Sequence, residues 1–392
     1  MHKTTQQTRS IEKHEAADTL ACVRTAPAAA AIGSIEIEGP DALPIVQRIF
    51  RPAGEHVSFE EGQILYGRFL DADRIIDDGL VGVEGPDRLA LHCHGNPLIL
   101  QQILTLLQKH GAAIITPEQT LARRFFADCN NTIEAEAQLE SIKAVSLLGV
   151  KIIRNQTTTG LLNTVRQWLD STDSQTLRQE AEEILLRSQI AQRIIRGVRI
   201  VIAGPPNSGK STLLNRLAGR RQALVSETPG TTRDWVTCEG RIEPLQIEWI
   251  DTAGLDERLA GGDDLEQTAQ RTTRELLDRC DLILYVMDGT RAAAHPLSPS
   301  AAAPVLRILN KSDLPGFQSG PNAIPISAKD GTGLETLARA ILQTLQADSF
   351  DPAQPVAFTD RQKDLLRQIA AAGDPAVLKS RIGRLFQEPK PV

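Results

Sequence analysis

The sequence predicts a multidomain protein that combines an α/β domain, an α+β domain and a helical domain. The chain has 392 residues, which is more than one hydrophobic core usually supports. Strand and helix patterns alternate from residue 198 to about residue 347, as is typical of a parallel, doubly wound sheet. Helical patterns lie on both sides of that stretch.

This organisation divides the chain into five segments. They are a disordered N-terminal tail (1–17), an N-terminal α+β domain (18–117), the first part of the helical domain (118–196), the α/β domain (197–347) and a shortened second part of the helical domain (348–392).

The N-terminal domain alternates strand-like runs with two helical patterns. The strand-like runs are TLACV (19–23), AIGSIEIE (31–38), GQILYGRFL (62–70), GLVGVE (79–84) and RLALHCH (88–94). The 3.6-residue apolar spacing of DALPIVQRIF (41–50) and NPLILQQILTLLQKH (96–110) predicts two helices. Asp41 is a candidate N-cap, because its side-chain oxygen can accept a hydrogen bond from the first turn. His92 and His94 share one face of their strand with Cys93 on the other, so they do not form a three-ligand metal set.

A long helix is predicted immediately before the α/β domain. Its buried stripe consists of residues spaced three or four positions apart: Leu177, Ala181, Ile184, Ser188, Ala191 and Ile195. Gly197 ends this helix, and VRIVIAG (198–204) follows as a buried strand.

The composition favours a soluble, cytoplasmic protein with no membrane association. Hydrophobic residues make up 41% of the chain and charged residues 23%, and no apolar run approaches the roughly 18 residues of a membrane span. The five cysteines are odd in number and widely scattered, which argues against a disulfide framework and against a zinc site. The net charge of −6 gives no overall footprint for nucleic acid, so any contact with RNA must come from a local patch or a partner.

The run GPPNSGKS (204–211) follows a predicted strand and opens a predicted helix, which is the context that a phosphate-binding loop requires. Its glycines let backbone N–H groups turn toward phosphates, and the helix N-terminus adds a positive dipole end. We expect Lys210 to bridge the β- and γ-phosphates and the Ser211 hydroxyl to ligate Mg²⁺. The nucleotide-binding residues expected in this segment are Gly204, Asn207, Ser208, Gly209, Lys210, Ser211 and Thr212.

The identity of the base is predicted from NKSD (310–313), at the end of the strand pattern VLRILN. The Asp313 carboxylate can accept two hydrogen bonds from guanine, from N1–H and the exocyclic amine, whereas adenine would leave it unpaired. GTP is therefore favoured over ATP. We expect Asn310 to tie the base-binding loops together and Lys311 to lie over the ring. The segment SAKDG is expected to offer backbone N–H groups to guanine O6, from Ser327, Ala328 and Lys329.

Two further motifs, PGTTRD (229–234) and DTAG (251–254), lie between these stretches. Thr232 is the candidate switch threonine that reaches Mg²⁺ only when a γ-phosphate is present. Asp251 is expected to hold Mg²⁺ through water, and the Gly254 N–H to sense the γ-phosphate. The five stretches in this order specify a Ras-like GTPase fold. Leu255 stands where many small GTPases have a water-orienting glutamine, so the attacking water must be positioned by another residue.

The motifs GPPNSGKST, PGTTRD, DTAGL, NKSD and SAK, set after a helical segment and an α+β domain, resemble those of the MnmE (TrmE) tRNA-modification GTPases. The resemblance covers nearly the whole chain, and it implies a Ras-like, phosphate-loop G domain inserted into a helical domain and preceded by an N-terminal α+β domain. It implies GTP hydrolysis that is stimulated when the G domains of a homodimer meet across bound K⁺. It also implies a flavin-dependent partner protein and the modification of wobble uridine in tRNA.

The resemblance also implies residue roles. The K⁺ ligands would be Asn207, Ser226, Thr228 and Thr231. The water-orienting glutamate of the family lies at the helix start after DTAG, where DDLEQT makes Glu266 the candidate. The alternative for Glu266 is an ordinary solvated helix carboxylate.

The sequence departs from that family at two places. Members usually end in Cys-Ile-Gly-Lys, and that cysteine is implicated in the modification chemistry, whereas no cysteine follows Cys280 here. The segments that surround a formyl-tetrahydrofolate in the family read APAAAAIG (26–33) and CHGN (93–96), where alanine and asparagine replace glycines, so folate binding is doubtful. The alternative function is therefore a GTP-regulated switch or assembly factor that has lost the modification chemistry.

Overall fold

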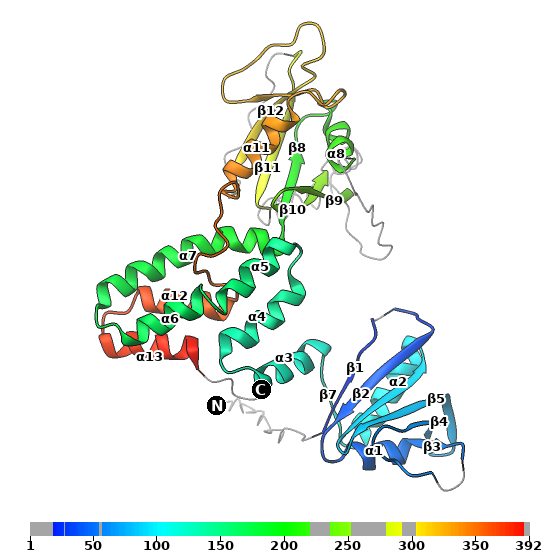
Figure 1. Ribbon diagram of the computed structural model, residues 1–392. Helices are drawn as coiled ribbons and strands as arrows, with labels where there is room; N and C mark the ends of the chain where they lie inside the picture. Colours follow the sequence, from blue (N-terminus) through cyan, green and yellow to red (C-terminus); the bar gives the residue numbers. More distant parts are fainter. Residues whose placement is uncertain are drawn as a thin grey trace, which may run out of the picture. The chain divides into compact units, whose positions relative to one another are not determined.

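The computed structural model describes residues 19–26, 28–54, 57–219, 236–251, 280–291 and 303–387. The chain divides into two compact units, with the boundary between Ala127 and Asp128. The predicted fold class, a multidomain protein with α+β, helical and phosphate-loop α/β parts, is confirmed (Figure 1). None of the described helices is long and apolar enough to cross a membrane.

The smaller unit is built on a seven-stranded sheet with the order β3-β4-β5-β6-β2-β1-β7. Its strands are β1 (Leu20–Val23), β2 (Ile32–Glu38), β3 (Phe50–Pro52), β4 (Ile64–Asp71), β5 (Arg74–Gly85), β6 (Arg88–His94) and β7 (Ala113–Ile114). Its helices are α1 (Ala42–Ile49) and α2 (Pro97–Lys109), and α3 (Pro117–Asp128) ends it. Neighbouring strands pair antiparallel except β1 and β7, which run parallel.

The core of the smaller unit lies between the sheet and helices α1 and α2. Ile35 and Ile37 of β2 and Leu89 and Leu91 of β6 are fully buried beneath these helices, as the two-residue period of a half-buried strand requires. Asp41 occupies the N-cap position of α1, but its side chain makes no capping hydrogen bond, so the capping role predicted for it is wrong.

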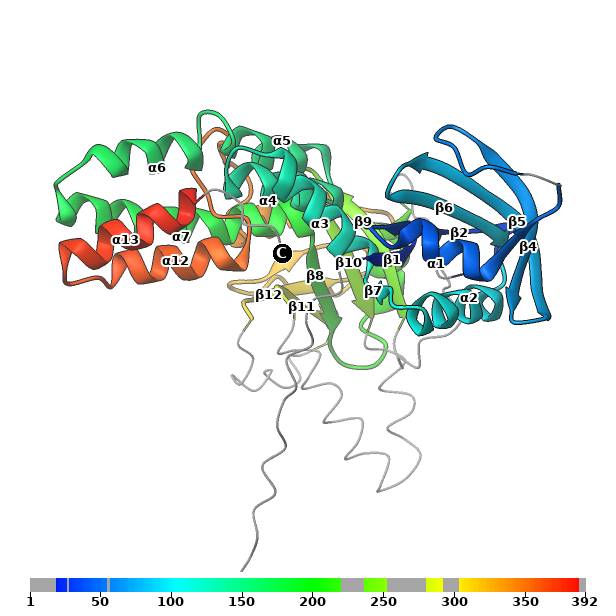
Figure 2. The same ribbon diagram turned by 90° about the horizontal axis from the view of Figure 1, so that it is seen from below.

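The helical part of the larger unit comes from two stretches of sequence. Its helices are α4 (Thr132–Lys143), α5 (Leu147–Gln156), α6 (Leu161–Asp170), α7 (Ser174–Arg196), α12 (Asp360–Ala370) and α13 (Pro375–Phe386). Helix α12 packs along α7, and α13 packs on α6 and α4 (Figure 2). All six residues of the stripe predicted on the long helix are buried in α7, so that prediction is confirmed.

The α/β part of the larger unit is a six-stranded sheet with the order β13-β12-β11-β8-β10-β9. Its elements are β8 (Val198–Ala203), α8 (Lys210–Ala218), β9 (Val236–Ile242), β10 (Leu245–Asp251), β11 (Leu282–Asp288), β12 (Val305–Asn310), β13 (Ile324–Pro325) and α11 (Leu334–Thr344). All pairs are parallel except β9 with β10. The carboxyl ends of the parallel strands therefore meet at one edge, where open α/β sheets bind their ligands.

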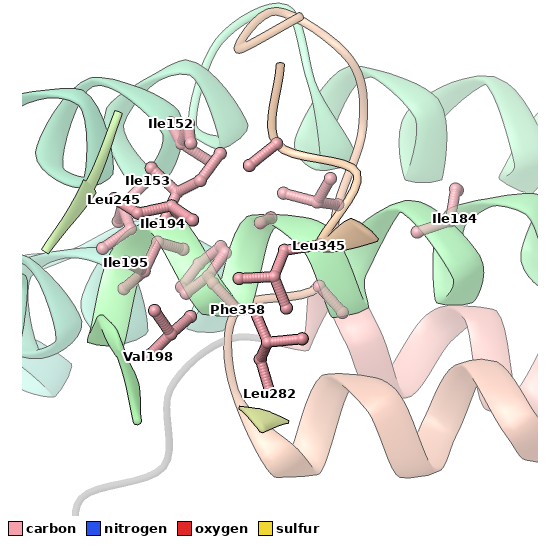
Figure 3. Close-up of a cluster of buried hydrophobic side chains, with 14 of the residues drawn as sticks. Ile152, Ile153, Ile184, Ile194, Ile195, Val198, Leu245, Leu282, Leu345 and Phe358 are labelled. Carbon is pink, nitrogen blue, oxygen red and sulfur yellow. The ribbon is translucent and has the colours of Figure 1, made fainter. Parts of the chain in front are cut away.

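One hydrophobic core joins the helices of the larger unit to its sheet. Figure 3 shows this junction, with side chains contributed by helices, strands and the segment that follows α11: Ile194, Ile195, Val198, Leu245, Leu282, Leu345 and Phe358. Because α7 runs into β8 through Gly197 alone, the apolar end of this helix and the start of the strand bury each other.

Candidate nucleotide-binding site

The loop between β8 and α8 has a backbone that only glycine can adopt at two positions. Gly204 has φ +145°, and a Cβ there would lie 2.1 Å from Val286 O. Gly209, the N-cap of α8, has φ +94°, and a Cβ there would lie 2.2 Å from Asn310 Nδ2. Strain and collision would both oppose any side chain, so the two glycines set the path of the loop.

Lys210 and Ser208 are buried within this loop. Lys210 Nζ donates to Gly204 O (2.8 Å) and Pro205 O (3.2 Å), so its ammonium group lies inside the curve of the loop. Ser208 Oγ is buried and has no hydrogen-bond partner among the described residues. Asn207 is exposed with φ +63°, and Thr212 is exposed on the first turn of α8. The lysine, the buried hydroxyl and the N-terminus of α8 suit a phosphate chain.

Ser211 and Asp251 meet where α8 begins and β10 ends. The Ser211 hydroxyl donates to Asp251 Oδ2 at 2.9 Å, and Asp251 is almost fully buried. A hydroxyl and a carboxylate beside a phosphate loop are the oxygen ligands that Mg²⁺ prefers. The two side chains therefore fit the Mg²⁺ expected of them.

Asn310, at the end of β12, connects two loops that are far apart in sequence. Its side-chain nitrogen Nδ2 donates to Ser208 O (2.8 Å), and its oxygen Oδ1 accepts from Ala328 N (2.9 Å). Asn310 is buried, so both bonds lie away from water. The phosphate loop and the loop that begins at Ser327 are thereby joined through one side chain.

Lys311 has a partner that the sequence analysis did not identify. Lys311 Nζ donates to Asp288 Oδ2 at 2.7 Å, while Asp288 Oδ1 accepts from Thr290 N (3.0 Å) and Thr290 Oγ1 (2.7 Å). Burial alone would raise the pKa of the Asp288 carboxyl, but the hydrogen bonds from Lys311 and Thr290 outweigh it and lower the pKa to about 2. The carboxylate therefore stays charged and fixes the lysine side chain. The nearby Asp313 carboxylate is exposed.

The loop that begins at Ser327 is held by its own hydrogen bonds. Ser327 is fully buried, its O accepts from Gly331 N (2.8 Å), and its Oγ accepts from Asp330 N (3.2 Å). A second residue that the sequence analysis missed, Arg216 of α8, donates from Nε to Ala328 O (3.2 Å) and from Nη2 to Lys329 O. The loop is thus attached to α8 as well as to Asn310.

The structure brings one set of the expected residues to the carboxyl edge of the sheet: Gly204, Asn207, Ser208, Gly209, Lys210, Ser211, Thr212, Asp251, Asn310, Lys311, Asp313, Ser327, Ala328 and Lys329. The other set lies outside the described residues: Ser226, Thr228, Thr231, Thr232, Gly254 and Glu266. Roles assigned to this second set remain predictions.

In the smaller unit, the segments CHGN and APAAAAIG pair with each other. Gly95 N donates to Ala31 O (3.3 Å), and Gly95 O accepts from Ala30 N (2.9 Å). Asn96 caps α2 by accepting from Leu98 N (2.9 Å). These backbone and side-chain groups are therefore already paired inside the unit, and the doubt about folate binding remains a prediction. No group of three metal-binding side chains occurs in the described parts of either unit.

Two family models match the chain. The model described as the GTP-binding protein TrmE N-terminus matches residues 19–127, and the model described as a 50S ribosome-binding GTPase matches residues 199–312.

Curated relatives match over most of their length. The tRNA modification GTPase MnmE of Xylella fastidiosa (strain 9a5c) is 33% identical over 383 residues, covering 85% of this chain and 82% of that protein. The tRNA modification GTPase MnmE of Geobacter metallireducens is 29% identical over 398 residues, covering 89% and 86%. Among solved structures, the G domain of the T. maritima FeoB iron transporter aligns with a TM-score of 0.28 and 21% identity, over 38% of this chain and 98% of that one.

Proposed function

Because the chain belongs to the MnmE family of tRNA modification GTPases and is a GTP hydrolase, we propose that it hydrolyses GTP in the modification of wobble uridine in tRNA. The tRNA role is supported by the relatives described above. The guanine-nucleotide site is supported best by the Asn310 side chain, which joins the phosphate loop to the loop beginning at Ser327. The loops that would bind the guanine base, beside Asp313, would then be connected directly to the loop that would bind the phosphates of the same nucleotide. The proposal includes a cytoplasmic location and tRNA as a partner.

Different described residues would bind the phosphates, the base and Mg²⁺. Lys210, Ser208 and the first turn of α8 would hold the phosphate chain, with Lys210 exchanging its loop carbonyls for phosphate oxygens. Asp313 would accept the N1–H and amine of guanine, and Lys311, held by Asp288, would cover the ring. Ser211 and Asp251 would hold Mg²⁺, which when bound neutralises charge on the β- and γ-phosphates.

The proposal further includes K⁺ at Asn207 with Ser226, Thr228 and Thr231, stimulation by dimerisation, and Glu266 as the residue that orients the attacking water. In this arrangement Thr232 and Gly254 would respond to the γ-phosphate. Asn207 suits its part because it is exposed in the phosphate loop with φ +63°, a conformation that asparagine adopts more readily than most residues. A cation at that position would offset negative charge between the β- and γ-phosphates, as an arginine finger does.

The K⁺ role predicts a salt-specific rate. GTP turnover should be faster in KCl than in NaCl at equal ionic strength, and Asn207→Ala should abolish the difference while GDP still binds. Steady-state phosphate release in the two salts measures this. Equal wild-type rates in both salts would eliminate the K⁺ ligand set without affecting the assignment as a GTPase.

The tRNA role predicts a nucleoside phenotype. A strain lacking the gene should lose modified wobble uridine, and complementation with this chain should restore it, as measured by mass spectrometry of digested tRNA. Lys210→Ala serves as the GTP-binding-defective control. Unchanged nucleosides in the deletion strain would favour the alternative, a GTP-regulated switch or assembly factor without modification chemistry.

A further inference from the structure

Arg216 lies in the helix that the phosphate loop opens, but away from the phosphate end. It follows Lys210 by six residues, which corresponds to about 9 Å along a helix that rises about 1.5 Å per residue. Its charge is therefore not placed to neutralise a phosphate. Its guanidinium group instead reaches the loop beginning at Ser327, where Nε donates to Ala328 O (3.2 Å) and Nη2 donates to Lys329 O.

These two bonds fix the orientation of consecutive peptide groups. A guanidinium group presents its donors in a rigid, planar fork, so binding two successive carbonyls constrains both peptide planes together. The position that a Cβ would take on Gly331 is 3.9 Å from Arg216 Cζ, so the guanidinium group also packs against the turn that follows. Arg216 thus holds the loop by contact as well as by hydrogen bonds.

The orientation of the carbonyls determines where the amides point. In a trans peptide the C=O of one residue and the N–H of the next point in opposite directions. Because Ala328 O faces Arg216, the Lys329 N–H faces away from α8. The neighbouring amides are already used, since Ala328 N donates to Asn310 Oδ1 and Asp330 N donates to Ser327 Oγ. Lys329 N has no hydrogen-bond partner among the described residues.

We propose that Arg216 is a positioning residue for base recognition, which holds the 328–329 peptide so that the Lys329 N–H is presented to the O6 oxygen of guanine. This inference rests on the proposed guanine site. Arg216 contacts neither base nor phosphate in it. Its effect should therefore appear only for bases that carry an acceptor at the O6 position.

The test compares two diphosphates on the full chain. GDP carries O6, whereas the diphosphate of 2-aminopurine riboside keeps the exocyclic amine but lacks O6 and, with it, the N1–H; the loss of N1–H weakens the analogue equally in wild type and variant, so each nucleotide is compared with itself. Arg216→Ala should raise the Kd for GDP about tenfold, the effect of losing one well-placed hydrogen bond, and should change the Kd for the 2-aminopurine nucleotide less than twofold. Isothermal titration calorimetry for GDP and competition against it for the analogue measure both constants.

Arg216→Lys keeps the charge but not the two-donor fork, so its Kd for GDP should lie between those of wild type and Arg216→Ala. This variant replaces Arg216→Ala in the test if the alanine variant is unstable. Arg339→Ala is the matched control, because the Arg339 side chain is exposed on α11 and makes no hydrogen bond or ion pair among the described residues. It should change the Kd of neither nucleotide. Hydrogen exchange of the peptide that contains residues 327–333, without nucleotide, should be faster in Arg216→Ala.

Two outcomes would overturn the inference: Arg216→Ala weakening both nucleotides equally, or weakening neither. A wild-type chain that binds no guanine nucleotide would instead refute the proposed site itself. The two failures are therefore distinguishable.

Discussion

At the scale of single residues, the ion pair between Asp288 and Lys311 links folding stability to the loop proposed to bind the base. Asp288→Asn removes the charge but keeps the size of the side chain, so it should cost about 1–2 kcal/mol of unfolding free energy near pH 7. The pKa of Asp288 is about 2 in the folded chain, below the ordinary 3.8. The stabilisation is therefore fully present above about pH 4 and is lost as the pH falls toward 2.

The cost of Asp288→Asn should consequently be roughly halved at pH 3. Urea denaturation followed by circular dichroism at pH 7 and pH 3 measures it. Asp170→Asn, at an exposed position at the end of α6, is the control and should have little effect at either pH. A cost that is the same at both pH values would show that the carboxylate charge does not contribute.

Motif spacing predicted which neighbouring residues would form the proposed nucleotide site, because the segments GPPNSGKS and NKSD each fold locally around backbone geometry. It did not predict Asp288 or Arg216. Each contacts a loop that lies well away in sequence, Asp288 reaching Lys311 across 23 residues and Arg216 reaching Ala328 across 112. Neither belongs to a motif, and only the parallel sheet places them beside their partners.

At the scale of elements, one buried glutamine attaches the segment after α11 to the helical part. Gln156, at the end of α5, is fully buried. Its Nε2 donates to Ile152 O and Gln354 O (both 3.1 Å). Its Oε1 accepts from Leu161 N and Val356 N (both 2.9 Å). Three of these hydrogen bonds hold α6 and the returning chain through one side chain, and the fourth, to Ile152 O, lies within α5. That chain leads directly into α12.

Gln156→Leu should therefore destabilise the protein by about 3 kcal/mol, since it leaves several buried backbone groups without partners. Gln167→Leu is the control and should cost little, because the Gln167 side chain is exposed on α6 and makes no hydrogen bond among the described residues. Guanidinium denaturation of the two variants compares them. Similar small costs for both would mean that water replaces the lost bonds at Gln156.

The predictability of elements follows their length and apolar content. The long helix α7 and the buried strand β8 were predicted because each carries a sustained apolar pattern. Strand β9 was missed because Glu239, Gly240 and Arg241 interrupt its sequence, and its place in the sheet comes from antiparallel pairing with β10. Strands β3 and β7 have three and two residues, which is too short for any period to show.

At the scale of the whole molecule, the described chain contains two large hydrophobic cores that have no residue in common, one in each unit. Both units also hold buried glutamates paired with arginine: Glu36 in the smaller unit, and Glu136 and Glu140 in the larger one. In the smaller unit, Glu36 pairs with Arg24 (3.1 Å), Arg88 (3.2 Å) and Arg124 beside a cavity of about 280 Å³. In the larger unit, Glu136 of α4 accepts two bonds from Arg361 of α12 (2.6 and 2.8 Å), which connects the two sequence halves of the helical part.

These paired sites allow the units to be destabilised separately. Glu36→Ala should lower the unfolding free energy of the smaller unit only, and Glu136→Ala that of the larger unit only, each by about 2 kcal/mol, because each substitution removes charge-assisted hydrogen bonds to arginine. GDP at 100 times its Kd should raise the unfolding free energy of the larger unit by about 2.7 kcal/mol and leave that of the smaller unit unchanged. Differential scanning calorimetry of the full chain, with and without GDP, resolves these effects. If both variants and GDP moved one common transition, the two cores would unfold as a single cooperative structure, and the smaller unit would then sense the nucleotide state through that cooperativity.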